Sequence, residues 1–265
     1  MGPFVDPSFQ NVQVSPVGLC PKKEPNKYGL IHHLSYPKGI SVNNHILPEM
    51  KSVNITRIDD AISTIKPYDS PVYMAKCDIE MAYSNLPLSP SEYHTFGIFW
   101  NGVYYFDKCL AMGCASACQI FERFSSVLKL IGQWYMPNGE IIHILDDFLI
   151  NAPGKDLCKL YLDRFLYIYK QIGTQMAPNK TVEPVQVLTF LGLELDTIKY
   201  EARLPQEQIV KCLEQIDLFL PRRKVTLTKI QMLCGLLNFA AKVVVAGRPF
   251  LRRLYDLTYG NLISS

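Results

Sequence analysis

Two adjacent carboxylates interrupt an apolar run of strand length at residues 141–150. Asp146 and Asp147 lie in the middle of this run, where burying an unpaired charge costs several kcal/mol. The run is rich in β-forming residues, so the acidic break predicts the tip of a tight hairpin from which both side chains project. A divalent cation tolerates such crowding of carboxylates, and the alternative is a solvated Asp-Asp turn.

A third acid follows another strand-like segment. Residues 72–79 predict a strand that finishes around Asp78, and the aromatic Tyr83 follows on the next turn. If this strand lies beside the acidic hairpin, Asp78 supplies the third carboxylate that a two-metal site requires. Cysteine and histidine indicate no other metal site, because the eight cysteines form no Cys-x-x-Cys pair and the five histidines show no ligand spacing. We expect mostly buried free thiols.

Turns and short strands are expected on the N-terminal side of these acids. The first fifty residues are rich in Pro, Gly, Asn and Ser and predict a small antiparallel ribbon. Apolar residues at helical spacing predict a helix at residues 55–65. Residues 96–106, folded back across Asn101-Gly102, form the clearest hairpin in the chain.

Helices are expected beyond Gly113. A long amphipathic helix begins after this residue, and its predicted core face carries Ile120, Phe124, Val127, Leu128, Ile131 and Tyr135. A second helix is predicted at about residues 155–171. Residues 188–195 and 199–204 predict a further pair of strands.

The C-terminal segment is helical and basic. Residues 206–220, 226–242 and 248–257 predict three helices, the second with Thr226 as its N-cap. Between residues 211 and 253 there are nine basic residues and two acids. That skew suits a polyanion, and a merely solvated basic face is the alternative.

The composition is that of a globular chain. Of 265 residues, 48% are hydrophobic and 19% charged, with a formal net charge of +3, which allows one large or two small domains. No window approaches the roughly 18 uncharged apolar residues of a membrane span, and the first residues lack the pattern of a signal peptide. We therefore expect an intracellular protein, cytoplasmic or nuclear, with no membrane partner.

Five short segments lie in order along the chain, at residues 77–83, 110–114, 145–148, 177–181 and 190–193. In order and spacing they resemble the successive motifs of reverse transcriptases, the RNA-directed DNA polymerases. The segments at residues 30–37, 120–125 and 247–254 most resemble retrotransposons of the DIRS type, which carry a tyrosine recombinase. The resemblance covers nearly the whole chain. It implies an α+β right-hand polymerase fold, with N-terminally truncated fingers at residues 1–70, a palm with some fingers elements at 71–204, and a short helical thumb at 205–265.

The resemblance also implies a reaction and a metal site. A primer 3′-hydroxyl attacks the α-phosphate of a deoxynucleoside triphosphate, and two Mg²⁺ ions, or Mn²⁺ in their place, stabilise the attacking and leaving oxygens. By resemblance Asp78 and Asp146 bind the metals, and Asp147 supports one of them. The backbone carbonyl of Ile79 adds a ligand, and Lys180 protonates the departing pyrophosphate.

Further residues are implied at the substrates. Lys22 approaches the triphosphate, the ring of Tyr83 lies beneath the sugar and excludes a 2′-hydroxyl, and Met112 and Gly113 lie close to template and nucleotide. Each of these residues has an ordinary alternative. Lys22 and Lys180 can be surface lysines, Tyr83 can be a packed aromatic ring, and Gly113 can be the small residue that a helix start needs. The basic residues expected to grip the template and primer are Arg222, Arg223, Lys224, Lys229, Arg248, Arg252 and Arg253.

Gly29 departs from the family pattern, which has an arginine there to clamp the triphosphate. The leading prediction is the RNA-directed DNA polymerase of a retroelement, acting on dNTPs and on an RNA or DNA template with a primer. Ribonuclease H and tyrosine recombinase domains of a retroelement polyprotein are expected partners. The alternative is a catalytically silent or decayed module that still binds nucleic acid. A third possibility is a nucleotide cyclase built on a similar palm, but such an enzyme predicts no basic helical tail, which this chain has.

Overall fold

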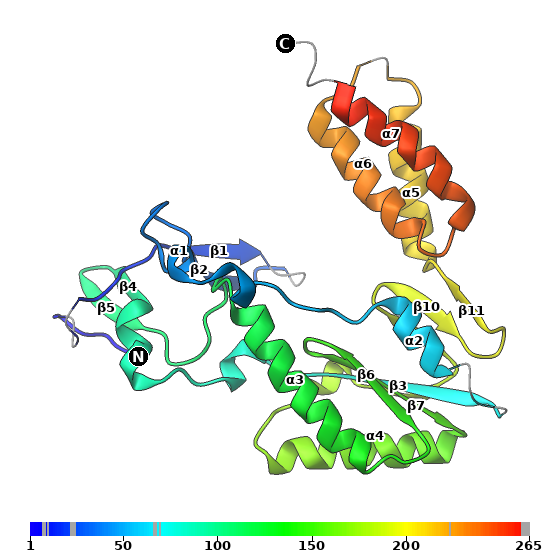
Figure 1. Cartoon of the computed structure of the whole chain (residues 1–265), viewed down its shortest axis with the longest axis horizontal. Helices are drawn as coiled ribbons and strands as arrows, with labels where there is room; N and C mark the ends of the chain where they lie inside the picture. Colours follow the sequence, from blue (N-terminus) through cyan, green and yellow to red (C-terminus); the bar gives the residue numbers. More distant parts are fainter. Residues whose placement is uncertain are drawn as a thin grey trace.

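An antiparallel sheet of four strands in the order β6-β7-β3-β8 forms the centre of the computed structural model, which describes residues 1–6, 9, 11–21, 25–65, 68, 70–222 and 224–260. The strands are β3 (Val72–Asp78), β6 (Glu140–Ile144), β7 (Asp147–Pro153) and β8 (Val182–Val185). Two helices, α3 (Ala117–Trp134) and α4 (Lys155–Gln171), pack against one face of it (Figure 1).

The two faces of the sheet bury different partners because side chains alternate along each strand. Ala75 and Cys77 of β3 belong to a cluster with α3 and α4, whereas Val72 and Met74 belong to a second cluster. This second cluster includes residues of α2 (Ile58–Ile65) and of a three-stranded sheet. The strands of that sheet are β9 (Val187–Phe190), β10 (Leu193–Asp196) and β11 (Glu201–Arg203). The central sheet is therefore held from both sides.

Short elements make up the N-terminal part of the chain. Strand β1 (Val17–Pro21) pairs with β2 (Tyr28–His32), and β4 (Gly97–Trp100) pairs with β5 (Val103–Phe106), which confirms the ribbon and the Asn-Gly hairpin. The chain also contains one short α-helix and five 3₁₀ turns among the described residues: α1 (Val42–His45), Pro48–Met50, Ala82–Asn85, Pro90–Thr95, Pro178–Lys180 and Val245–Gly247.

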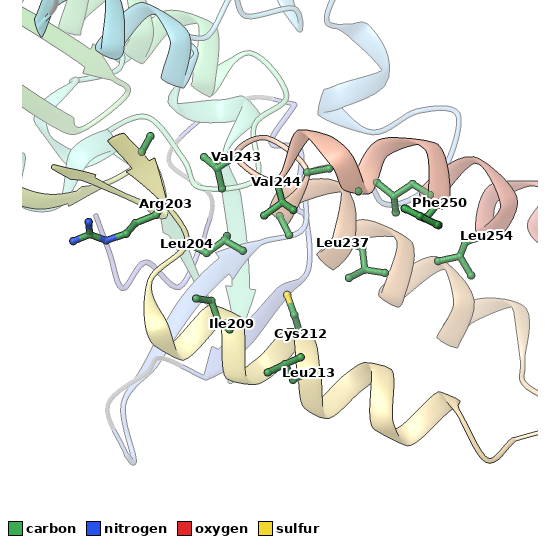
Figure 2. A pocket seen from close by; sticks show the side chains of 15 residues that line it. Arg203, Leu204, Ile209, Cys212, Leu213, Leu237, Val243, Val244, Phe250 and Leu254 are labelled. Carbon is green, nitrogen blue, oxygen red and sulfur yellow. The ribbon is translucent and has the colours of Figure 1, made fainter. Parts of the chain in front are cut away.

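Three helices lie together at the C-terminal end, away from the four-stranded sheet (Figure 1). They are α5 (Gln206–Phe219), α6 (Leu227–Ala240) and α7 (Arg248–Gly260), which confirms the three predicted helices. Thr226 occupies the N-cap position of α6, although its side chain makes no capping hydrogen bond. Apolar side chains of these helices, among them Ile209, Leu237 and Phe250, surround a cavity of about 520 Å³ (Figure 2).

The predicted helix at residues 155–171 is confirmed as α4, and the one at residues 55–65 is confirmed from Ile58 onward. One strand prediction is wrong, because residues 188–195 form a hairpin and not a single strand. Leu191 and Gly192 both have positive φ, 51° and 77°, which turns the chain back on itself.

All eight cysteines are free thiols, and five of them are buried. Within the described residues, no helix has the length and apolar character needed to cross a bilayer.

The predicted core face of α3 is only partly correct, because Leu128 is buried and Phe124 packs against the core but the four other predicted residues are exposed. Val127 and Tyr135 are about half exposed, and the row that faces the core contains Ala117, Phe121, Ser125, Leu128 and Gly132. The small residues in this row let the helix approach its neighbours closely, a requirement that hydrophobicity alone does not reveal.

Gly132→Ala tests this close approach. A Cβ atom at Gly132 would lie 2.5 Å from the ring of Phe165 and 2.8 Å from Ile141, so we expect a loss of about 1–3 kcal/mol in the free energy of unfolding. The matched control is Gly235→Ala in α6, where no atom lies within 4 Å and a gain of about 0.4–1 kcal/mol is expected. Denaturant unfolding measures both, and equal effects of the two substitutions would refute the packing argument.

Candidate active site

The three candidate acids meet at one end of the central sheet. Strand β3 pairs with β7 so that Asp78 lies opposite Asp147, a register that typically places Cα atoms about 4.5–5.5 Å apart. Asp146 lies in the two-residue turn between β6 and β7, and its carbonyl accepts a hydrogen bond of 3.0 Å from the backbone N–H of Ile79. The acidic hairpin is confirmed, with Leu145 and Asp146 at its tip and Asp147 as the first residue of β7.

Two lysines neutralise two of these carboxylates. Lys180 Nζ lies 2.8 Å from Oδ1 of the buried Asp78, and Lys76 Nζ lies 3.0 Å from Oδ1 of Asp147. The sequence analysis singled out Lys180 but missed Lys76. The available signal was its position two residues before Asp78, which places both side chains on the same face of β3.

Burial and mutual repulsion govern the ionisation of the aspartates. Burial raises the pKa of Asp78, with a further contribution from the charge of Asp146, while the hydrogen bond from Lys180 opposes the rise. Burial likewise raises the pKa of Asp146, and the charge of Asp147 adds to it. The same hydrogen bond to Asp78 raises the pKa of Lys180, which keeps its amine protonated. The site therefore concentrates negative charge that needs a cationic partner.

The donor chemistry fits Mg²⁺, because carboxylate oxygens are the hard ligands that this ion prefers. The side-chain arrangement does not yet form a ligand set: among the described residues no group of three or more His, Cys, Asp or Glu is placed to hold a metal ion. Lys180 and Lys76 supply positive charge at Asp78 and Asp147 instead. Metal binding would require these lysines to give up their present contacts.

Tyr83 lies near the acidic end of the sheet: burial raises the pKa of its hydroxyl, and the nearby charge of Asp146 adds to the rise. The Tyr83 hydroxyl is 3.2 Å from Cys118 Sγ, and its ring packs edge-on against Phe121 at 5.4 Å. This contact supports the packed-ring alternative, and it is also compatible with a ring held in place for a substrate. The role of Cys118 was missed by the sequence analysis.

Gly113 is a glycine for a steric reason. Its φ is +118°, and a Cβ atom here would lie 2.1 Å from the carbonyl oxygen of His32. Met112, which is 55% exposed, accepts a hydrogen bond from the backbone N–H of His32 through its carbonyl. The Asn43 side chain donates to the carbonyl of Gly113, so this loop is fixed to β2 and α1.

A second cavity, of about 550 Å³, adjoins the acidic turn. Its lining includes Ile144, the residue before the turn, and Leu191 of the β9–β10 hairpin. Three basic residues, Arg57, Lys242 and Arg248, and the acidic Asp59 also line it. The lining therefore carries a net positive charge beside the residue that precedes the acidic turn. Neither Arg57 nor Lys242 was among the predicted site residues.

The predicted nucleic-acid-binding residues lie at the C-terminal end. Arg222, Lys224, Lys229, Arg248, Arg252 and Arg253 are all exposed. The predictions for Lys22 and Arg223 fall outside the described residues. Gly29 lies in β2 opposite Cys20, and its position is partly exposed.

The fold is the mixed α/β fold of viral reverse transcriptases. The chain superposes on the foamy viral protease–reverse transcriptase dRH in complex with double-stranded DNA with a TM-score of 0.74 and 16% identity, over 95% of this chain and 40% of that one. It also superposes on the foamy viral protease–reverse transcriptase in complex with an RNA/DNA hybrid, with a TM-score of 0.67 and 16% identity, over 92% of this chain and 31% of that one.

In sequence, 147 residues are 26% identical to Protein P of hepatitis B virus genotype C, subtype ayr, a match that covers 55% of this chain and 17% of that protein. No family model matches the chain. The predicted relatedness to reverse transcriptases is supported, and the closer likeness to DIRS-type retrotransposons stays a prediction.

Proposed function

We propose that the chain is the polymerase module of a reverse transcriptase that joins deoxynucleotides to a primer on an RNA or DNA template. The observation that carries the proposal is the meeting of Asp78, Asp146 and Asp147 at one sheet end, in a fold shared with reverse transcriptases solved on nucleic acid. In this assignment residues 1–70 are fingers, residues 71–204 the palm and residues 205–265 the thumb. An intracellular retroelement of the DIRS type is the proposed source.

Five residues of the chain would bind the metal ions or donate a proton in this reaction. Asp78 and Asp146 would hold two Mg²⁺ ions, with support from Asp147 and the carbonyl of Ile79, and the ions would supply Lewis-acid stabilisation of the attacking and leaving oxygens. Lys180, kept protonated by its contact with Asp78, would leave that contact and donate its Nζ proton to the departing pyrophosphate.

The nucleic acid would be held by charge. The exposed basic residues of the C-terminal helices would bind the phosphates of template and primer in a mainly sequence-independent way. Arg248 also lines the cavity beside the acidic turn, together with Arg57 and Lys242. Arg248 would thereby connect the basic helices to the cavity beside the acidic turn and help to bring the primer end to the acids.

Primer extension on an RNA template in Mg²⁺ tests the proposal directly. A second candidate, a silent module that binds nucleic acid without extending a primer, is favoured by Gly29 and by the lysines that already neutralise Asp78 and Asp147. Tight binding of an RNA/DNA hybrid without any extension in Mg²⁺ or Mn²⁺ would establish that candidate and reject the polymerase.

Tyr83→Ala is expected to lower discrimination against ribonucleotides by roughly 10- to 100-fold, because a shortened side chain no longer collides with a 2′-hydroxyl. The ratio of kcat/KM for a dNTP to that for the matching NTP measures the effect. Tyr83→Phe is the control, since it keeps the ring on Phe121 and loses only the contact with Cys118. Equal discrimination by the Ala and Phe variants would show that the ring is only a packing residue.

A further inference from the structure

The turn that carries Asp146 contains a strained backbone. Leu145, directly before Asp146, has φ of +51°, in the left-handed region that residues other than glycine rarely adopt. A release of this conformation would rotate the peptide between Ile144 and Leu145 relative to the residues that follow, and so re-aim the carboxylate of Asp146. Something in the surrounding structure must therefore hold the turn.

A carboxylate from α3 holds it. The backbone N–H of Leu145 donates a hydrogen bond of 3.0 Å to Oε2 of Glu122, 23 residues earlier in the chain. The other oxygen, Oε1, lies 3.1 Å from Nε2 of His143 on β6. The two side chains are only 13% and 7% exposed, so both contacts are made away from solvent, where hydrogen bonds to a charged group are strongest.

His143 is itself held in place. Its ring stacks on Phe148 of β7 with a centroid distance of 5.4 Å and an angle of 19° between the planes. Ser126 of α3 approaches Nε2 at 3.4 Å, whereas the buried Nδ1 has no hydrogen-bond partner. Nε2 is thus the nitrogen that faces polar groups, and its proton is directed at Glu122.

Glu122 stays ionised in this position. Burial opposes its ionisation, but the hydrogen bonds from His143 and from the N–H of Leu145 outweigh burial and lower its pKa. The two hydrogen bonds run to His143 on β6 and to Leu145 in the turn, which points to a geometric role.

We infer that Glu122, held by His143, is a positioning residue that fixes the Leu145 peptide and so sets the direction in which Asp146 and Asp147 project beside Asp78. The inference concerns the geometry of the turn, and its catalytic consequence rests on the proposed function. Glu122 touches neither substrate nor reacting atoms in this assignment. It acts through the backbone of the turn.

Two variants of the full chain test whether the acceptor oxygen of Glu122 is what holds the turn. Glu122→Met keeps the length of the side chain but has no acceptor for the Leu145 N–H. Glu122→Gln keeps an acceptor oxygen for that N–H, and its NH2 group can donate to Nε2 of His143 once the imidazole proton moves to Nδ1. Glu207→Met on the exposed face of α5 is the control for the same change of chemistry elsewhere.

Hydrogen exchange of the Leu145 amide without metal is the first readout. We expect exchange to accelerate about 10- to 100-fold in Glu122→Met and to stay within a few-fold of the parent in Glu122→Gln and Glu207→Met, as expected for loss of a hydrogen bond to a charged acceptor. Unchanged exchange in Glu122→Met overturns the inference, whether or not the chain extends primers.

Primer extension is the second readout. We expect kcat of Glu122→Met to fall about 10- to 100-fold with KM for the primer–template unchanged. The kcat of Glu122→Gln should stay close to that of the parent chain. Faster amide exchange with an unchanged kcat would overturn the positioning role. Absence of extension in the parent chain would reject the proposed function alone, because the exchange measurement still decides what holds the turn.

Discussion

Asp146→Asn is expected to lower kcat for primer extension in Mg²⁺ by about 10³-fold or more, equivalent to roughly 4 kcal/mol of transition-state stabilisation. The substitution keeps the shape of the side chain and removes the negative charge that would bind a divalent cation. Primer extension on an RNA template measures the effect. Asp163→Asn on α4, in an exposed pair with Lys159, is the matched control and should leave kcat unchanged.

The same variant should be at least as stable as the parent at neutral pH. Burial raises the pKa of Asp146 in the folded chain, so the folded state binds this proton more tightly than the unfolded state. Ionised Asp146 therefore lowers the free energy of unfolding above its folded pKa, and this cost disappears as the pH falls through that value towards the unfolded pKa. Asparagine has no such cost. Thermal unfolding at pH 7 checks the sign.

Mg²⁺ provides a readout independent of turnover. A cation that binds only the folded state raises the thermal midpoint, so we expect Mg²⁺ to stabilise the parent chain and to have a smaller effect on Asp146→Asn. An equal shift in both chains, or full activity in the variant, would mean that Asp146 does not bind the metal. Loss of activity together with retained stability is the pattern expected of a functional carboxylate and not of a structural one.

Gly113→Ala is expected to lower the free energy of unfolding by at least about 3 kcal/mol and to abolish extension. Positive φ costs an alanine about 1–3 kcal/mol, and overpacking adds about 1–3 kcal/mol. Here the added Cβ would overlap the backbone oxygen of His32 at 2.1 Å, and a backbone atom cannot move aside as a flexible side chain can. The loop that carries Met112 would then separate from β2.

Gly39→Ala is the control for Gly113→Ala. Gly39 also has positive φ, +95°, but no atom lies within 4 Å of the position that an added Cβ would take, so only the conformational cost applies. Denaturant unfolding of both variants isolates the steric part. If Gly39→Ala destabilises the chain as much as Gly113→Ala, the contact with His32 contributes nothing.

Local sequence patterns were sufficient for several elements. The apolar run at residues 141–150 with its acidic break predicted the β6–β7 hairpin, and helical spacing at residues 55–65 predicted α2, which is observed from Ile58 onward. Both patterns depend on residues that are close in sequence, where periodicity and turn chemistry act directly. The same local view was only partly correct for α3, because which face is buried depends on how closely Phe165 and Ile141 approach Gly132.

The sequence by itself singled out the candidate residues: two acids in a hairpin, a third at the end of a strand, and a basic helical tail. Only the tertiary structure decided that β3 lies beside β7, which brings Asp78 to Asp147, that Lys76 pairs with Asp147, and that Glu122 and His143 meet at the turn. The physical reason is that strand order and side-chain contacts join residues tens of positions apart. They follow from how the whole core packs and not from any local period.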